Sequence, residues 1–132
     1  MITNITIADD DPDTREFVRH VLSGTRTNIV EAASGDALAA LLALQPPVDL
    51  LVTDIWMPPL SGLDLVARAR GRGFATPTLF ITGADDPELV RRVAQVGTAR
   101  LLRKPFGLVG LLGAVAHLMD AARSRPSAAL PL

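Results

Sequence analysis

Val48-Asp49-Leu50-Leu51-Val52 is a dense apolar run that ends at Thr53-Asp54. Its centre is uncharged and shows no alternation of polar and apolar side chains. Such a run is typical of a strand that is covered on both faces, as in a parallel sheet. The run therefore predicts a buried strand, with the polar pair Thr53-Asp54 at the end of that strand.

The same unit of a strand followed by a helix repeats on both sides of this run. Strands are predicted at residues 5–8, 28–32, 48–52, 78–81 and 100–103. Helices are expected to begin at Pro12, after a Ser34 cap, near Leu63, at Asp86-Pro87 and near Leu108. Right-handed crossovers place such helices on both faces of the sheet. The sequence therefore predicts an α/β fold with a doubly wound, five-stranded parallel sheet.

Length and composition narrow the class of protein. The 132 residues suit one domain, expected at 1–122, with a short flexible Ser/Ala/Pro-rich tail at 123–132. With 13 basic and 14 acidic residues there is no basic excess, which argues against nucleic acid as a partner. The longest charge-free stretch, 105–119, is shorter than the roughly 20 apolar residues of a membrane span. With no signal peptide visible either, a cytoplasmic protein without a membrane partner is expected.

Two counts of residue types bear on chemistry. The chain has no cysteine, so thiol catalysis and thiolate metal sites are excluded. Of the 13 basic residues, 12 are arginines, and Lys104 is the single lysine. Composition alone does not say whether this lysine has a function.

Polar side chains follow four of the five predicted strands. Asp9 and Asp10 come after the first strand, Asp54 after the third, Thr82 after the fourth and Lys104 after the fifth. Ligands of open parallel sheets bind beyond the carboxyl ends of the strands, so these side chains should converge. Carboxylate oxygens suit Mg²⁺, and a carboxylate can also attack phosphorus. The pattern predicts a site for phosphoryl chemistry.

Four segments, in order and at strand ends, carry a resemblance to a known family. They are Ile7-Ala8-Asp9-Asp10-Asp11-Pro12, Asp54-Ile55-Trp56-Met57-Pro58 with Gly62, Phe80-Ile81-Thr82-Gly83 and Lys104-Pro105-Phe106. Over about residues 4–122 the chain resembles a response-regulator receiver domain of bacterial two-component signalling. The resemblance implies a flavodoxin-like (βα)5 fold with strand order 2-1-3-4-5.

The resemblance also implies roles for individual residues. Asp54 matches the phosphoacceptor, which takes a phosphoryl group from a sensor histidine kinase or a histidine phosphotransfer protein. Asp9, Asp10, Asp54 and the backbone carbonyl of Trp56 match the ligands of Mg²⁺ or Mn²⁺. Thr82 matches the switch hydroxyl, and Lys104 matches the lysine that pairs with the phosphoryl group. The resemblance implies that the domain accepts a phosphoryl group at this site and is not an enzyme.

Further expectations concern the bond after Lys104 and the residues around the site. The Lys104–Pro105 peptide bond matches one that is usually cis in the family. Leu101 stands where the family usually has a Tyr or Phe switch residue, which puts the usual coupling to Thr82 in doubt. Trp56 and Ala84 are expected to hinder an attacking water and to lengthen the lifetime of the phosphoryl group.

The last predicted helix suggests a surface for a partner. Leu108, Leu111, Leu112, Val115 and Leu118 are expected to face the core. The opposite side would carry small or uncharged residues, namely Gly110, Gly113, Ala114, His117 and Ala121. Because an outer helix face is usually charged, we expect a homodimer or a partner to dock on the fourth helix, fifth strand and fifth helix, with Leu101 in the contact.

Three functions remain open at this point. The first is a receiver that lacks an output domain in this chain and signals by protein contact or phosphorelay. The second is a receiver fold that serves only as a docking module, an alternative kept by the missing aromatic at Leu101. The third, prompted by Asp9-x-Asp11, is a Mg²⁺-dependent phosphatase of the haloacid dehalogenase type, for which the chain is short.

Overall fold

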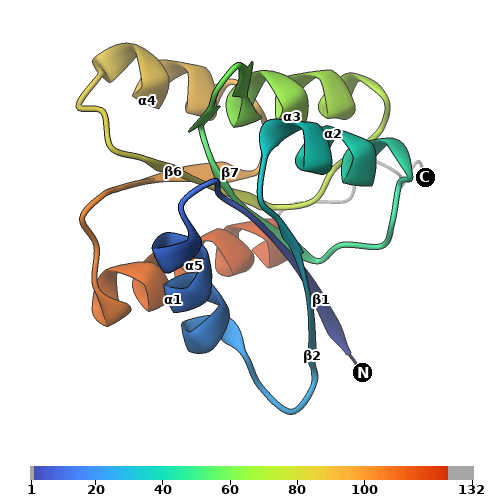
Figure 1. The fold of residues 1–132 in the computed structure, drawn as a ribbon, viewed down its shortest axis with the longest axis vertical. Helices are drawn as coiled ribbons and strands as arrows, with labels where there is room; N and C mark the ends of the chain where they lie inside the picture. The colour runs from blue at the N-terminus through green and yellow to red at the C-terminus, as the bar shows by residue number, and fades with distance from the viewer. Residues whose placement is uncertain (1, 125–132) are drawn as a thin grey trace.

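Five parallel strands form the central sheet of the computed structural model, which describes residues 2–124 (Figure 1). The strands are β1 (Thr3–Ala8), β2 (Thr27–Ala32), β3 (Leu50–Asp54), β6 (Thr78–Thr82) and β7 (Ala99–Arg103). Their order is β2-β1-β3-β6-β7, and every neighbouring pair is parallel. This arrangement confirms the predicted doubly wound sheet and its strand order 2-1-3-4-5.

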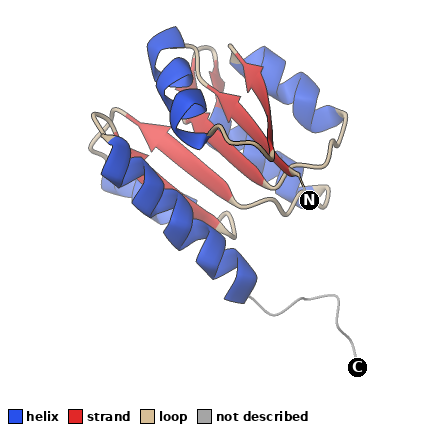
Figure 2. Ribbon diagram, turned by 90° about the horizontal axis from the view of Figure 1, so that it is seen from below, coloured by secondary structure: helices blue, strands red, loops and turns tan. Residues whose placement is uncertain are grey.

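Helices cover both faces of the sheet (Figure 2). They are α1 (Pro12–Leu22), α2 (Gly35–Ala43), α3 (Gly62–Gly71), α4 (Pro87–Ala94) and α5 (Leu108–Ser124). Val18 of α1 and Leu111 of α5 belong to one buried cluster, on one face. Leu38 of α2, Val66 of α3 and Val93 of α4 belong to the other. The sheet is thus the middle one of three layers. Polar side chains can therefore gather only at the ends of its strands.

Side-chain caps fix where the first four helices begin, and the hydroxyl of Ser61 caps α3 by accepting from the backbone N–H of Asp64. The carboxylate of Asp11 accepts from the backbone N–H of Asp13, and Pro12 opens α1. Ser34 caps α2 and Asp86 caps α4, as the sequence predicted. These caps satisfy backbone donors that a helix leaves unpaired in its first turn. The connections after β1 and β6 are short, and the caps fix the ends of these connections. The polar residues at the strand ends are thereby held in place.

The segment after β3 differs from the loop that the sequence predicted. β3 begins at Leu50 instead of Val48, and it includes Thr53 and Asp54. Beyond it, β4 (Trp56–Met57) and β5 (Leu60–Ser61) pair as a small antiparallel hairpin. The Pro58–Pro59 bond at its tip is cis. Strands of two residues carry no periodic pattern, which is why the sequence did not reveal them.

Helix α5 corrects the predicted assignment of its faces. Leu111 and Leu118 are buried as expected, but Leu108 and Leu112 are 53% and 45% exposed. Ala114, expected on the outer side, is buried at 6% exposure. Gly110, Gly113 and His117 are exposed. Because nearly every side chain of this helix is apolar or small, its pattern fits two rotations, and packing on the sheet selects the one that buries the short Ala114.

The end of α5 also bears on the expected domain boundary. The helix runs to Ser124, past the expected domain boundary at residue 122. Most of the predicted tail, residues 125–132, lies outside the described residues. Within residues 2–124 no helix is long and apolar enough to cross a membrane.

Arg70 ties the end of α3 to the segment between α4 and β7. Its guanidinium donates to the carbonyl oxygens of Val96 at 2.7 Å, Phe74 at 3.0 Å and Thr98 at 3.1 Å. The same group lies 5.4 Å from the centre of the Phe74 ring. One cation thereby satisfies backbone carbonyls from two connections at the amino-terminal edge of the sheet.

Candidate functional site

The carboxyl edge of the sheet brings together the polar residues that the sequence placed at strand ends. Asp9 and Asp10 follow β1, Asp54 ends β3, Thr82 ends β6 and Lys104 follows β7. One carboxylate oxygen from each of Asp9, Asp10 and Asp54 lies within 4.8 Å of the others. Such a cluster of oxygens is the donor set that hard divalent cations prefer.

Asp54 sits at the centre of this cluster with both oxygens engaged. Its Oδ1 accepts from the backbone N–H of Trp56 at 3.1 Å. Its Oδ2 accepts from the ammonium group of Lys104 at 3.2 Å. The residue is 8% exposed, so most of it is buried and its carboxylate is held in one orientation. A positioned carboxylate of this kind can act as a nucleophile.

Asp9 is the most deeply buried carboxylate of the site, at 1% exposure. Its Oδ1 accepts from the backbone N–H of Asp11 at 2.9 Å. Its Oδ2 is buried without a hydrogen bond and lies 3.3 Å from the Lys104 nitrogen. Burial raises the pKa of Asp9, and the Asp54 charge adds to that rise, although the Asp11 N–H and Lys104 oppose it. A buried acceptor without a hydrogen bond is a position that a cation can fill.

Lys104 contacts two carboxylates from one side. Burial favours its neutral form, but the charges of Asp54 and Asp9 outweigh burial and raise the pKa of Lys104 above its ordinary value. The backbone N–H of Lys104 donates to the carbonyl of Thr82 at 2.7 Å, which joins the ends of β7 and β6. The Lys104–Pro105 bond is cis, in agreement with the expectation. The single lysine of the chain is thus a charged neighbour of Asp54.

Thr82 has a buried side chain, and its residue is 5% exposed. Its Oγ1 accepts from the backbone N–H of Ala84 at 3.0 Å. A hydroxyl that accepts one bond keeps its own hydrogen for another acceptor. Ala84 itself is exposed and brings only a methyl group to the site.

Gly62 supports the site in a way that the sequence did not reveal. A Cβ at this position would lie 2.3 Å from the carbonyl oxygen of Asp54 and 2.9 Å from Oγ1 of Thr53. The N–H of Gly62 donates to the carbonyl of Ile55 at 2.6 Å, and Thr53 donates to the carbonyl of Asp54 at 2.9 Å. The start of α3 therefore packs directly on the backbone of Asp54. In the sequence, Gly62 stood among the segments that carry the family resemblance, but nothing there indicated this contact.

Trp56 and Leu101, which the sequence singled out around the site, differ in how deeply they are buried. Trp56 is 58% exposed beside Asp54, so its indole has room to lie over the site or away from it. Leu101 of β7 is partly buried and packs against the cluster beneath α2, α3 and α4. Leu101 is therefore on the α4 face of the sheet, apart from the acidic cluster.

An open parallel sheet with three carboxylates, a hydroxyl and a lysine at its carboxyl edge defines a class of phosphoryl-accepting signalling domain. The sequence matches the family described as the response regulator receiver domain over residues 5–116. The chain belongs to this family: a receiver domain is a phosphoacceptor of two-component systems rather than an enzyme, and receiver domains pair with histidine kinases.

Relatives and solved structures agree with this assignment. The chain is 34% identical to the response regulator MprA of Mycobacterium tuberculosis over 128 residues, which are 96% of this chain and 54% of MprA. It superposes on the receiver domain of NarL from Mycobacterium tuberculosis with a TM-score of 0.77 and 30% identity, covering 94% of this chain and 98% of that one. For CheY4 of Vibrio cholerae the TM-score is 0.77 and the identity 27%, covering 89% and 99%. The chain spans about half the length, or less, of the first curated relatives that it matches.

Proposed function

We propose that this protein is a response regulator that accepts a phosphoryl group on Asp54 from a sensor histidine kinase or a histidine phosphotransfer protein. The observation that carries the proposal is the position of Asp54. Its carboxylate lies in a cluster of three, whose oxygens are within 4.8 Å of one another, and 3.2 Å from the Lys104 nitrogen. Phosphoryl transfer depends mainly on such positioning and on neutralisation of charge.

In the proposed reaction an oxygen of Asp54 attacks the phosphorus of a phosphohistidine on the partner. The new O–P bond forms as the P–N bond breaks, and the leaving imidazole nitrogen keeps the electron pair and takes up a proton. Lys104 offsets negative charge on the transferred group, and the hydroxyl of Thr82 donates a hydrogen bond to one of its oxygens. Lys104, whose nitrogen lies 3.2 Å from Oδ2 of Asp54, is close enough to contact an oxygen of the phosphoryl group on that residue.

Mg²⁺ or Mn²⁺ fits the residues present. Asp9, Asp10 and Asp54 would hold the ion, together with the backbone carbonyl of Trp56. The buried Oδ2 of Asp9, which has no hydrogen bond, supports this assignment. When bound, the ion supplies positive charge for the carboxylates and for the phosphoryl oxygens.

The output is proposed to be protein contact or phosphorelay by a cytoplasmic protein. A homodimer or another partner would use α4, β7 and α5, where Val90 is 60% exposed and Leu112 45% exposed. Because α5 packs with Ala114 against the sheet, Ala114 is not part of this surface. The proposed surface keeps the exposed residues Gly110, Gly113 and His117, with Leu101 at its margin. Sedimentation with and without beryllofluoride tests the dimer, because a monomer at every concentration would contradict it.

A second candidate function is docking without phosphorylation switching. Leu101 favours it, because a leucine fills less space than the aromatic side chain of the family. In contrast, the phosphatase alternative loses its motif, since the Asp11 carboxylate is engaged as the α1 cap by Asp13 and Thr14. The hydroxyl of Thr14 accordingly lowers the pKa of Asp11.

One experiment separates the first two functions. Acetyl phosphate and Mg²⁺ are added to the wild type, to Asp54→Asn and to the control Asp64→Asn, an exposed carboxylate of α3. We expect a phosphorylated mass for the wild type and the control, none for Asp54→Asn, and amide shifts around Thr82 with beryllofluoride. Phosphorylation without such shifts would favour docking, and no phosphorylation of the wild type would reject the proposal.

A further inference from the structure

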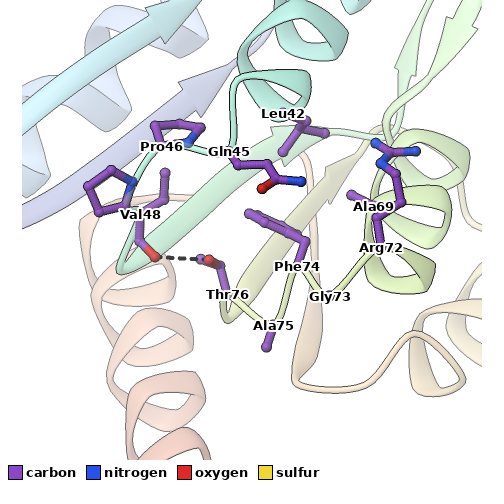
Figure 3. Close-up of a pocket in the computed structure, with 11 residues that line it drawn as sticks. Leu42, Gln45, Pro46, Val48, Ala69, Arg72, Gly73, Phe74, Ala75 and Thr76 are labelled. Atoms are coloured by element: carbon purple, nitrogen blue, oxygen red, sulfur yellow. Dashed lines mark hydrogen bonds between the residues drawn. The ribbon is translucent and has the colours of Figure 1, made fainter.

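A hollow of about 290 Å³ lies at the amino-terminal edge of the sheet, opposite the acidic site (Figure 3). One wall is the connection from α2 to β3, and the other is the connection from α3 to β6. Its apolar lining includes Leu42, Ala69 and Phe74. The hydroxyl of Thr76 donates to the carbonyl of Val48 at 2.9 Å and joins the two walls. The hollow is small, at the lower end of ligand-binding sites.

Two polar side chains complete the lining, and both are available to hydrogen-bond with a ligand. Gln45 and Arg72 both line the hollow. Figure 3 shows the Gln45 amide beside the Phe74 ring, with the Arg72 guanidinium at the Leu42 end. Within residues 2–124 no hydrogen bond or ion pair engages either side chain. A cation and an amide are thus available beside an apolar surface.

The backbone of Gln45 gives a second, independent observation. Its φ is 51°, and it is the one non-glycine residue with positive φ in the part of the chain that the structure describes. It directly follows the Leu44 cap of α2, a position at which helices usually have glycine. A side chain there is strained, and such strain is concentrated at functional sites. Glycine would relieve the strain but would remove the amide from the hollow.

We propose that this hollow binds a small carboxylic acid with a single ring or a short apolar chain. The carboxylate would pair with the Arg72 guanidinium, which presents a planar set of donors suited to carboxylates. The Gln45 amide would donate a further hydrogen bond, and the apolar body would lie against Leu42 and Phe74. This binding is independent of the phosphoacceptor function, because the hollow shares no residue with the acidic site.

The test uses phenylacetate as the probe, with 2-phenylethanol as a neutral compound of similar shape. Amide spectra of the whole chain are recorded during titration with each. We expect saturable shifts at Gln45, Gly73, Phe74 and Ala75 with phenylacetate, and weaker binding of the alcohol by about tenfold. Absence of saturable shifts with phenylacetate would overturn the proposal, as would equal binding of the alcohol.

Three variants show whether the named side chains are responsible. Arg72→Gln should weaken phenylacetate binding by about tenfold, whereas Arg68→Gln, at an exposed arginine of α3 outside the hollow, should not. Gln45→Gly should raise the melting temperature while it weakens binding. If Gln45 had only a structural role, Gln45→Gly would not raise the melting temperature and weaken phenylacetate binding together. Equal affinity in all three variants would reject the proposed site.

Discussion

The ammonium nitrogen of Lys104 lies 3.2 Å from Oδ2 of Asp54, and the two residues are 50 positions apart in the chain. Because β3, β6 and β7 run parallel in the sheet, the end of β3 and the residue after β7 meet at one edge. Because Asp9 Oδ2 lies 3.3 Å from the same nitrogen, one lysine faces two carboxylates. This relationship makes charge and shape at residue 104 separately testable.

Lys104→Arg keeps the charge but should still impair phosphorylation. A guanidinium is wider and planar, and it cannot occupy the place of a compact ammonium between two carboxylates. We expect phosphorylation of Asp54 by acetyl phosphate to slow by about tenfold, which corresponds to ~1.4 kcal/mol in the barrier. Arg103→Lys, an exposed neighbour, is the control and should react like the wild type. Equal rates for Lys104→Arg and the control would contradict the role of Lys104.

Asp9→Asn should stabilise the protein without metal and abolish its stabilisation by Mg²⁺. The substitution removes a buried charge whose Oδ2 has no hydrogen bond, and the retained Oδ1 can still accept from Asp11. We expect the free energy of unfolding to rise by about 1 kcal/mol in urea titrations with EDTA. Asp36→Asn, in the first turn of α2, serves as the control. A Mg²⁺-dependent stability gain in Asp9→Asn equal to that of the wild type would exclude Asp9 as a ligand.

The stability gain of Asp9→Asn should depend on pH. The pKa of Asp9 is raised in the folded state, so between its ordinary value of 3.8 and the raised value the folded protein binds more protons than the unfolded chain. Stability from this group is therefore present at low pH and is lost as pH rises through the folded pKa. We expect the melting temperatures of the variant and the wild type to converge near pH 3.8 and to separate above it. A constant difference across that range would show that Asp9 does not titrate as inferred.

Gly62→Ala should destabilise the fold and disturb the acceptor. The added Cβ would lie 2.3 Å from the Asp54 carbonyl oxygen, so the start of α3 has to move. We expect a loss of about 1–3 kcal/mol, in the range of overpacked sites, measured by chemical denaturation. Gly71→Ala is the matched control, because a Cβ there meets nothing within 4 Å and alanine favours the helix. Similar losses in both variants would point to helix effects and not to contact with Asp54.

Trp56→Ala should shorten the lifetime of phosphorylated Asp54 and leave stability nearly unchanged. The indole is 58% exposed beside the acceptor, so its removal opens the site to water and disturbs little packing. We expect hydrolysis to accelerate several-fold when phosphorylated protein is followed by mass after the donor is removed. Leu44→Ala, an apolar residue that is 77% exposed and remote from the site, is the control. Unchanged hydrolysis in Trp56→Ala would show that Trp56 does not shield the phosphoryl group.

The sheet and the placement of the site residues were predictable because both follow from the alternation of strand-like and helix-like segments along the chain. Apolar or β-prone segments marked the strands, and the polar residues after four of them marked one common edge, which brought Asp9, Asp54 and Lys104 together. The faces of α5 were not predictable, since Leu108, Leu112 and Ala114 differ too little in polarity to fix a rotation. The contact of Gly62 with the Asp54 backbone left no signal either, because a glycine shows where space is limited only once its neighbours are known.

The Arg70 guanidinium has a mechanical consequence for α4. It holds the carbonyls of Val96 and Thr98, just beyond the end of α4, whereas the Pro87 end follows Thr82 by a short exposed segment. A displacement that starts at Thr82 would therefore be largest at the Pro87 end of α4 and smallest near Val96, so that α4 would rotate about its carboxyl end. The exposed pair of Arg92 with Asp64 of α3, at 2.5 Å, lies in the path of that swing and would have to break or follow it.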